Sequence, residues 1–282
     1  MKPVLVLLIG LALQSGTSNA DAVLARMDGY LALYEPRLSE LVADEVMTQD
    51  VKQTLPPQPS SASRGLEQLR IRRAIHSEVA FIALPEDAGW LGFRNVKAVD
   101  GKPVTLAERS LAASLSSSRL DTARLMLHDS AAYNLGLPRT TNLPNLPLEF
   151  LHPRNRRRLL ARIDGQATIR GVPTTRLVLL ERMTPTLIQN PIDRSDMPSV
   201  IRAWVDTHGR LLRAEVSIYT SLSAKQYQHH LRVEFIEDRA LQLLVPAEML
   251  EDFPVELPGS GRSTAKYSNF RRFQTAARIV PQ

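Results

Sequence analysis

The sequence predicts an α+β fold in which one large, curved antiparallel sheet, a half-open barrel, is covered by an N-terminal helix and a central helical block. Helical periodicity is confined to residues 21–35 and 105–135. Extended runs separated by turn residues dominate the C-terminal half, and eight or more strands are expected in all. Because helices and strands are segregated along the chain and do not alternate, the pattern favours α+β over α/β.

The first twenty residues have the pattern of an export signal. Lys2 supplies a positive start, the run VLVLLIGLALQ is apolar, and Ser18 and Ala20 occupy the small-residue positions of a cleavage site. The run is shorter than the roughly 20 apolar residues that span a membrane, and no later stretch is long and apolar enough to do so. We therefore expect residues 1–20 to be a signal peptide and residues 21–282 to form a single exported α+β domain, either periplasmic or secreted.

Composition narrows the class of protein. The chain contains no cysteine, so neither a disulfide nor thiol catalysis is available, and its stability has to come from a packed core. The formal charge is +6, and it falls to +5 when the single charged residue of the signal, Lys2, is removed. This modest excess favours contact with anionic surfaces such as lipid head groups, but it is far from a nucleic-acid-binding composition.

Residues 21–35 are expected to form an amphipathic helix that Asp21 can cap. Its apolar residues recur at spacings of three and four, along one stripe: Val23, Met27, Tyr30 and Tyr34. Pro36 is expected to end this helix, because the residue before a proline avoids the helical conformation.

The central helical block, residues 105–135, contains an approximate capping box in Ser118 and Asp121, and Gly136 stands where a helix terminator belongs. One of its faces is apolar: Leu120, Ala123, Leu127 and Ala131. The proline-rich stretch 137–155 that follows can hold only short pieces of regular structure.

Strands are expected in the first half of the chain at 38–50 and, as an antiparallel pair, between about 68 and 100. Residues 55–65 are rich in breakers and are interpreted as an exposed connection. Asp100-Gly101 is the kind of dipeptide that favours tight hairpin turns.

The C-terminal half predicts consecutive hairpins. Asp164-Gly165 is interpreted as one hairpin turn and Thr207–Gly209 as another. The clearest strand pattern is a period of two near residue 233, in which three apolar residues alternate with three polar ones: Leu231, Val233 and Phe235 with His230, Arg232 and Glu234. This alternation predicts one buried and one solvated face.

The segment TAKYSNFRRFQT, residues 264–275, is expected to be the closing strand. Ser263 and Lys266 have the S-x-x-K spacing of some serine acyl-transfer enzymes, but no helical pattern surrounds them and the companion K-T-G motif is absent. In a strand the two side chains point to opposite faces. Each face mixes aromatic and cationic residues, which favours a place near a sheet edge or barrel rim, where arginine stems cover apolar surface.

No catalytic, cofactor-binding or metal-ligating set stands out, and no cofactor is expected. The motifs G-x-S-x-G and H-E-x-x-H are absent. His230 and Glu234 share a strand face but lie roughly 13 Å apart along the strand, too far to hold one zinc ion together. The carboxylate pairs Glu86-Asp87 and Glu251-Asp252 are interpreted as surface charge in loops.

The densest charge feature is RNRRR, residues 154–158. Its arginines are the candidate contacts for an anionic lipid, a polysaccharide or a partner protein: Arg154, Arg156, Arg157 and Arg158. The alternative interpretation, a solvated loop and strand edge whose charge discourages edge pairing, is favoured.

Four segments resemble, in order, the marker segments of a group of uncharacterised exported bacterial proteins: WLGFRNVKAVDGKPV, ARLMLHDSAAYNLG, RTTNLPNLPLEFL and YSNFRRF. At the level of architecture, the signal peptide, the first helix and the large antiparallel sheet also resemble the periplasmic lipoprotein carriers. In that fold a half-open barrel wraps helices and shelters acyl chains, so the resemblance implies an apolar ligand. The long helical middle differs from the carriers, and no functional residue is carried over.

These observations favour a non-enzymatic exported protein that binds a lipid, a lipoprotein or another apolar ligand in the envelope, or a partner protein. One alternative is an exported hydrolase whose acid or base is a carboxylate scattered in the sequence. A concave cluster of two carboxylates would support that class, and an apolar concavity would count against it. The other alternative is an envelope-assembly protein that acts through the Arg154–Arg158 patch.

Overall fold

The computed structural model describes residues 7–55, 67–84, 89–104, 127–136, 139–190, 193–221, 226–255 and 258–272. The named elements are, in chain order, α1 (Leu7–Leu38), β1 (Leu41–Leu55), β2 (Glu67–Leu84), β3 (Gly89–Val99), β4 (Lys102–Pro103), α4 (Leu146–Leu151), the 3-10 helix η3 (Pro153–Arg158), β5 (Leu159–Ile169), β6 (Val172–Glu181), β7 (Ser199–Val205), β8 (Leu211–Ser221), β9 (Gln226–Asp238), β10 (Leu243–Phe253) and β11 (Gly259–Arg272).

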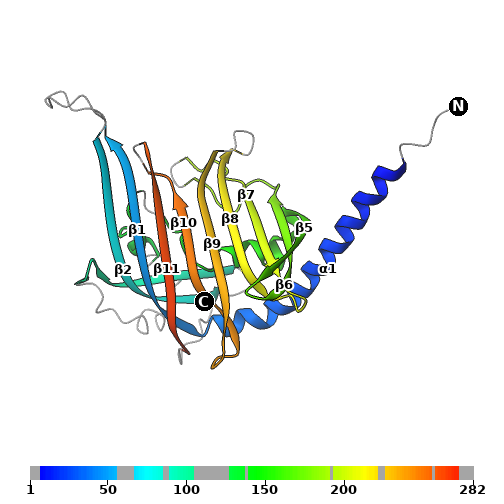
Figure 1. The fold of residues 1–282 in the computed structure, drawn as a ribbon, viewed down its shortest axis with the longest axis horizontal. Helices are drawn as coiled ribbons and strands as arrows, with labels where there is room; N and C mark the ends of the chain where they lie inside the picture. The colour runs from blue at the N-terminus through cyan, green and yellow to red at the C-terminus, as the bar shows by residue number, and fades with distance from the viewer. Residues whose placement is uncertain are drawn as a thin grey trace, which may run out of the picture.

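These strands form one 11-stranded sheet in the order β4-β3-β2-β1-β11-β10-β9-β8-β7-β6-β5, and all the pairings are antiparallel. Neighbours in space are neighbours in sequence except at β11, which lies between β1 and β10 and so joins the two ends of the chain. The sheet curves but does not close (Figure 1). The predicted fold class, an α+β protein built on a large curved antiparallel sheet, is confirmed.

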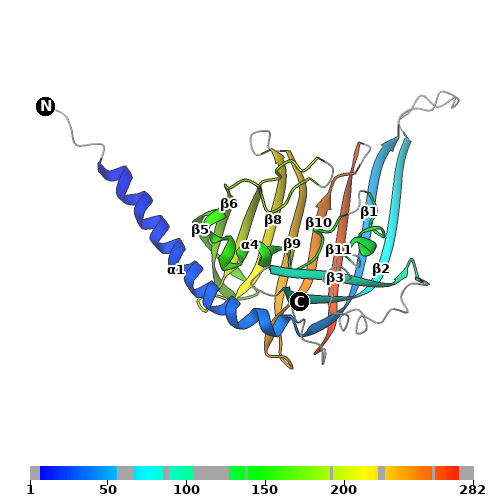
Figure 2. The same ribbon diagram turned by 180° about the vertical axis from the view of Figure 1, so that it is seen from behind.

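The concave face of the sheet carries the cover. Figure 2 shows α1, α4 and the crossing strand β3 in front of this face. The stripe predicted on the first helix packs into the main core, with Tyr30 partly buried and the following residues buried: Ala20, Val23, Leu24, Met27, Leu31, Tyr34 and Leu38. The prediction that Pro36 ends this helix is wrong, because α1 continues to Leu38. Pro36 lies on the exposed side of the last turn, where a missing N–H removes a single helical bond.

Part of the predicted central helical block lies within the described residues. Residues 127–131 are helical there, and Gly136, with φ of 74°, follows in the left-handed conformation expected after a helix. Ser118 and Asp121 lie outside the described residues, as do residues 56–65 of the expected exposed connection and Glu86-Asp87. The proline-rich stretch contains the short elements α4 and η3, as expected.

Two hairpin turns of the sheet are made by residue pairs with positive φ. Asp100 and Gly101, at 50° and 77°, join β3 to β4 and confirm that predicted turn. The turn predicted at Asp164-Gly165 is wrong, because β5 continues through it with a bulge. Arg170 and Gly171, at 48° and 80°, make the turn to β6. This later turn lets the whole of β5 pair with β6, whereas the earlier one would have paired about half of it.

The closing strand β11 has the predicted extended structure but not the predicted place. It is a central strand of the sheet, between β1 and β10, and not an edge strand. Ser263, Ala265 and Tyr267 are buried and Lys266 is exposed, as a strand requires. Asn269 has φ of 51°, and the register with β1 shifts nearby, so the alternation ends there. The mixed pattern of the last residues therefore reflects this irregularity and not an edge.

In β9 the alternation holds, since Leu231, Val233 and Phe235 are buried and their neighbours are partly exposed. Thr207–Gly209 form the turn between β7 and β8, as predicted. Within the part of the chain that the structure describes, none of the helices combines the length and apolar character needed to span a bilayer.

The packing of this turn on α1 can be tested at Gly209. Its φ is 82°, and a Cβ there would collide with the backbone carbonyl of Arg26 in α1. Gly171 is the matched control, because its φ of 80° is nearly the same but a Cβ would meet nothing within 4 Å. We expect Gly171→Ala to lower the free energy of unfolding by about 1–2 kcal/mol and Gly209→Ala by about 1–3 kcal/mol more. Equal losses in urea unfolding would show that the turn does not constrain α1.

Candidate functional site

The concave face near the free ends of β1, β2, β10 and β11 is built as cross-strand rows of side chains. One row is polar and consists of Arg73, Gln49, Ser263 and Glu251. On the side toward the main core, the next row is apolar and consists of Ile75, Met47, Ala265 and Met249. On the side toward the strand ends, the next row, the rim row, consists of Ile71, Val51, Gly261 and Phe253. A polar row thus separates two apolar ones.

The polar row is completed by residues 133–136 and 139–145, which cross this face and are called the crossing segment below. Gln49 binds it through both ends of its amide: Nε2 donates to Asn134 Oδ1 at 2.8 Å, and Oε1 accepts from the Leu135 backbone N–H at 2.6 Å. Asn142 Nδ2 donates to the same Asn134 oxygen at 2.9 Å. Arg73 donates to the Tyr133 carbonyl. We call Gln49, Ser263, Glu251, Asn134, Arg139 and Asn142 together the polar belt.

Glu251 is the centre of the polar belt and is 1% exposed. Its Oε1 accepts from Arg139 Nε at 2.7 Å and lies 2.9 Å from His229 Nε2, while its Oε2 accepts from Ser263 Oγ at 2.6 Å. Burial opposes ionisation, but the His229 hydrogen bond and the Arg139 charge outweigh it and lower the pKa of Glu251 to about 2. The carboxylate is therefore ionised and fully occupied at neutral pH.

A second buried ion pair lies on the same face. Glu45 and Arg94 are 1% and 3% exposed and are joined by a two-pronged contact, of which the Nη2–Oε1 arm measures 2.9 Å. Burial disfavours the charge of Arg94, but Glu45 more than compensates, so the arginine pKa is raised. Arg94 also donates to the Asn142 carbonyl at 3.0 Å, which ties this pair to the polar belt. Burial and the nearby Glu45 carboxylate raise the pKa of Tyr267 well above its usual range.

The loop interpretation of Glu251-Asp252 is therefore wrong, since both residues lie in β10. The sequence around this charged pair indicates a loop because the partner that neutralises Glu251, Arg139, lies far away in the sequence. One local signal was available: Met47, Gln49 and Val51 are two residues apart, which places Gln49 on the same face as two apolar residues.

The polar belt contains one arrangement that resembles catalytic geometry. Thr141 Oγ1 lies 3.3 Å from His229 Nδ1, and His229 Nε2 lies 2.9 Å from Glu251, so hydroxyl, imidazole and carboxylate follow one another. A triad needs a carboxylate dedicated to the histidine and donors for an oxyanion. Here Glu251 is shared with Arg139 and Ser263. These contacts join Thr141 of the crossing segment to His229 and Glu251 of the sheet.

The rim row is the apolar feature that the cover leaves partly open. Val51 and Phe253 are buried and cluster with Leu135, apart from the main core. Ile71 is 37% exposed, and Leu69, two residues further along the same face of β2, is 40% exposed. The concave face thus ends in an apolar strip whose outer flank meets solvent.

The arginines singled out in the sequence lie in η3. Arg154 pairs with Glu149, Arg156 with Asp28 of α1, and Arg158 donates to the Pro185 carbonyl at 2.6 Å. Arg157 is exposed. The segment thus fastens η3 to its neighbours, and contact of these arginines with an anionic partner stays a prediction.

The other residues considered in the sequence are not brought together into a reactive site. His230 lies 2.9 Å from Ser217 Oγ, and Glu234 pairs with Arg213 and Arg170. Among the described residues, no group of three or more His, Asp or Glu side chains could hold a metal ion. Ser263 donates to Glu251, so the S-x-x-K spacing has no serine–lysine contact behind it.

No protein-family model matches the chain, and no curated protein is similar to it in sequence. Among solved structures, it is similar to a DUF1329 family protein from Desulfovibrio piger, with 11% identity over 91% of this chain and 93% of the other and a TM-score of 0.37. It is also similar to a putative outer membrane lipoprotein-sorting protein domain from Vibrio parahaemolyticus, with 11% identity over 94% of each chain and a TM-score of 0.35. A third similar structure is a LolA superfamily protein from Nitrosomonas europaea, with 13% identity over 92% of this chain and 94% of the other and a TM-score of 0.30. These neighbours include the lipoprotein-carrier group that the sequence resembles, but with such low TM-scores and identities they say nothing about what this chain binds.

The energetic weight of the Arg139–Glu251 pair can be measured with two neighbouring substitutions. Glu251→Gln leaves the buried guanidinium of Arg139 without its counter-charge, so we expect a loss of about 3–5 kcal/mol in the free energy of unfolding. Asp252→Asn is the matched control, because Asp252 pairs with Arg262, whose side chain is 72% exposed. It should cost less than about 1 kcal/mol. Equal costs in urea unfolding at neutral pH would contradict the assignment.

The same variant predicts a pH dependence. The pKa of Glu251 is lowered from 4.5 to about 2 on folding, so its contribution to stability is present above about pH 4.5 and lost as the pH falls toward 2. The difference in unfolding free energy between native protein and Glu251→Gln should therefore shrink across that window. A difference that stays constant from pH 6 to pH 3 would rule out an ionised Glu251 as the source.

Proposed function

We propose that the protein is an exported, non-catalytic binding protein that takes up the acyl chain of a lipid or of a lipid-modified protein along the rim row. One observation carries this proposal: the rim row is apolar, lies on the concave face, and continues outward into the half-exposed Ile71 and Leu69. The polar belt, by contrast, satisfies its own carboxylates and amides and needs no ligand.

The dimensions of the strip favour an acyl chain over a protein partner. A stable protein interface buries about 800 Å² on each side, more than one row of side chains with a single exposed flank offers. An acyl chain can lie along one row, and each methylene that it buries contributes about 0.8 kcal/mol. The polar belt closes the strip on its inner side, so the ligand would enter from the strand ends.

The proposal is tested by adding a neutral acyl probe, monooleoylglycerol, to the protein purified after expression of the full-length sequence. We expect the probe to raise the melting temperature and to be recovered bound by native mass spectrometry. Leu69→Asp should weaken binding about tenfold, because it removes the roughly 1.4 kcal/mol or more that burial of a leucine side chain contributes.

Leu160→Asp is the matched control, since Leu160 is 50% exposed on the edge strand β5, far from the rim row. It should leave binding unchanged. No binding by the native protein, or equal weakening by both substitutions, would refute the acyl-chain proposal. Recovery of the probe as free oleate would instead favour the alternative of an exported hydrolase that uses carboxylates scattered in the sequence.

Export is part of the same proposal, and α1 supports it. Among the α1 residues whose burial the structure describes, Ala20 is the first buried one, and the first half of this helix projects away from the sheet (Figure 1). Removal of residues 1–20 would therefore take only Ala20 from the described buried stripe and leave the other six buried residues, Val23 to Leu38, in place. We expect the intact mass of protein recovered from the periplasm or medium to correspond to a chain that begins at Asp21. Recovery of the uncleaved chain in the cytoplasm alone would contradict the proposal.

A further inference from the structure

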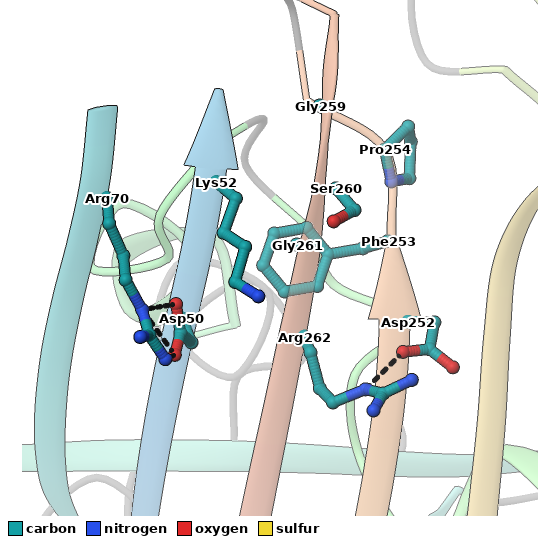
Figure 3. Close-up of a pocket in the computed structure, with 10 residues that line it drawn as sticks. All are labelled: Asp50, Lys52, Arg70, Asp252, Phe253, Pro254, Gly259, Ser260, Gly261 and Arg262. Carbon is teal, nitrogen blue, oxygen red and sulfur yellow. Dashed lines mark hydrogen bonds and ion pairs between the residues drawn. The ribbon is translucent and has the colours of Figure 1, made fainter. Parts of the chain in front are cut away.

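A hollow lies at the ends of β1, β2, β10 and β11, and its charged side chains stand on the convex face of the sheet, opposite the rim row. Its volume is about 660 Å³, which is ample for a small polar group. The residues that line it, all drawn in Figure 3, are Asp50, Lys52, Arg70, Asp252, Phe253, Pro254, Gly259, Ser260, Gly261 and Arg262. Three cations and two carboxylates leave an excess of one positive charge.

Both carboxylates of the hollow are already neutralised. Asp50 accepts two hydrogen bonds from Arg70 Nε, at 2.8 and 3.0 Å to its two oxygens, and one from Arg72 at 3.2 Å. These arginines, Arg70 first, lower the pKa of Asp50 to about 2. Asp252 accepts from Arg262 Nε at 2.6 Å. Each carboxylate is therefore paired with its own guanidinium, and neither is left to neutralise the third cation of the hollow.

Lys52 is that remaining cation. It is exposed, and among the described residues no carboxylate lies within ion-pair distance of it. Figure 3 shows its side chain leaning from β1 toward β11, where the hydroxyl of Ser260 stands. A lysine ammonium, a serine hydroxyl and a nearby guanidinium form a donor set that matches the oxygens of a phosphate.

Two glycines allow close packing at the strand ends beside the hollow. A Cβ at Gly259 would collide with the Lys52 carbonyl, and a Cβ at Gly261 would collide with the ring of Phe253, which crosses β11 there. Without side chains at these positions, β11 lies close to β1 and the Phe253 ring lies across it; Phe253 and Pro254 also line the hollow. The hollow therefore offers donors on one side and an apolar wall on the other.

We propose that this hollow binds the phosphate of a phosphate ester, with Lys52 as the principal contact and Ser260 and Arg262 beside it. The shared chemistry is a phosphate joined to a small glycerol-like group, which either a soluble ester or a lipid head group supplies. This site goes beyond the acyl-chain proposal. Its lining shares Phe253 and Gly261 with the rim row, but its proposed contacts, Lys52, Ser260 and Arg262, lie on the opposite face of the sheet and require no apolar chain.

The test measures binding of sn-glycerol 3-phosphate by calorimetry, with glycerol as the uncharged control, and co-sedimentation with phosphatidylglycerol vesicles, with phosphatidylcholine vesicles as the neutral control. We expect Lys52→Ala to weaken binding at least fivefold. Lys266→Ala is the matched control, because Lys266 is an exposed lysine on the same face of the neighbouring strand β11 and lies outside the hollow. It should leave binding within twofold of native.

Loss of glycerol phosphate binding in Lys52→Ala alone would support the site and identify a soluble ester as sufficient. Binding only to phosphatidylglycerol vesicles, again lost in Lys52→Ala alone, would support the site with a lipid head group as the source. Equal weakening by both lysine substitutions would show that binding depends only on general surface charge, and it would overturn the proposal. The absence of binding to both probes would overturn it too. Neither result would bear on monooleoylglycerol, which carries no phosphate.

Discussion

The ion pair between Arg139 and Glu251 is the interaction on which the concave side of this protein depends. Both side chains are buried, so loss of either partner would leave a charge without compensation. Arg139 lies in the irregular segment that crosses the sheet and Glu251 lies on the sheet itself. The pair therefore fixes where the segment crosses, and the hydrogen bonds of Gln49 and Asn142 follow from that position. Contacts from His229 and Ser263 offset part of the desolvation cost.

A satisfied polar belt divides the concave face into two apolar regions with different accessibility. The pleat of the sheet causes this division, because Met47, Gln49 and Val51 of β1 point to the same face. The polar residue lies between the two apolar ones, and its cross-strand neighbours extend it into a polar row between two apolar rows. The inner region is closed by α1 and α4 and serves stability. The outer region ends at the strand tips, where Ile71 and Leu69 remain half exposed.

The strand tips also differ between their two faces. On the concave face Gly261 lets the Phe253 ring lie across β11, which completes the rim row. On the convex face the same strands carry Lys52 and the two arginine–carboxylate pairs. An apolar strip and a cationic hollow thus back onto each other across one layer of backbone. On the concave face, the buried carboxylates Glu45 and Glu251 are each ion-paired with a buried arginine.

Local pattern in the sequence determined the class of fold, the buried stripe of α1 and the strand alternation in β9, because helical and extended periods are properties of near neighbours. It could not determine that β11 lies between β1 and β10, that Arg170-Gly171 and not Asp164-Gly165 makes a hairpin turn, or that Glu251 is buried. Two of these depend on a partner distant in the sequence, β1 for β11 and Arg139 for Glu251. The turn depends on the pairing of β5 with β6 along its whole length, which either dipeptide could have begun. The candidate sites were decided by tertiary structure alone, since rows and hollows exist only once strands pair in register.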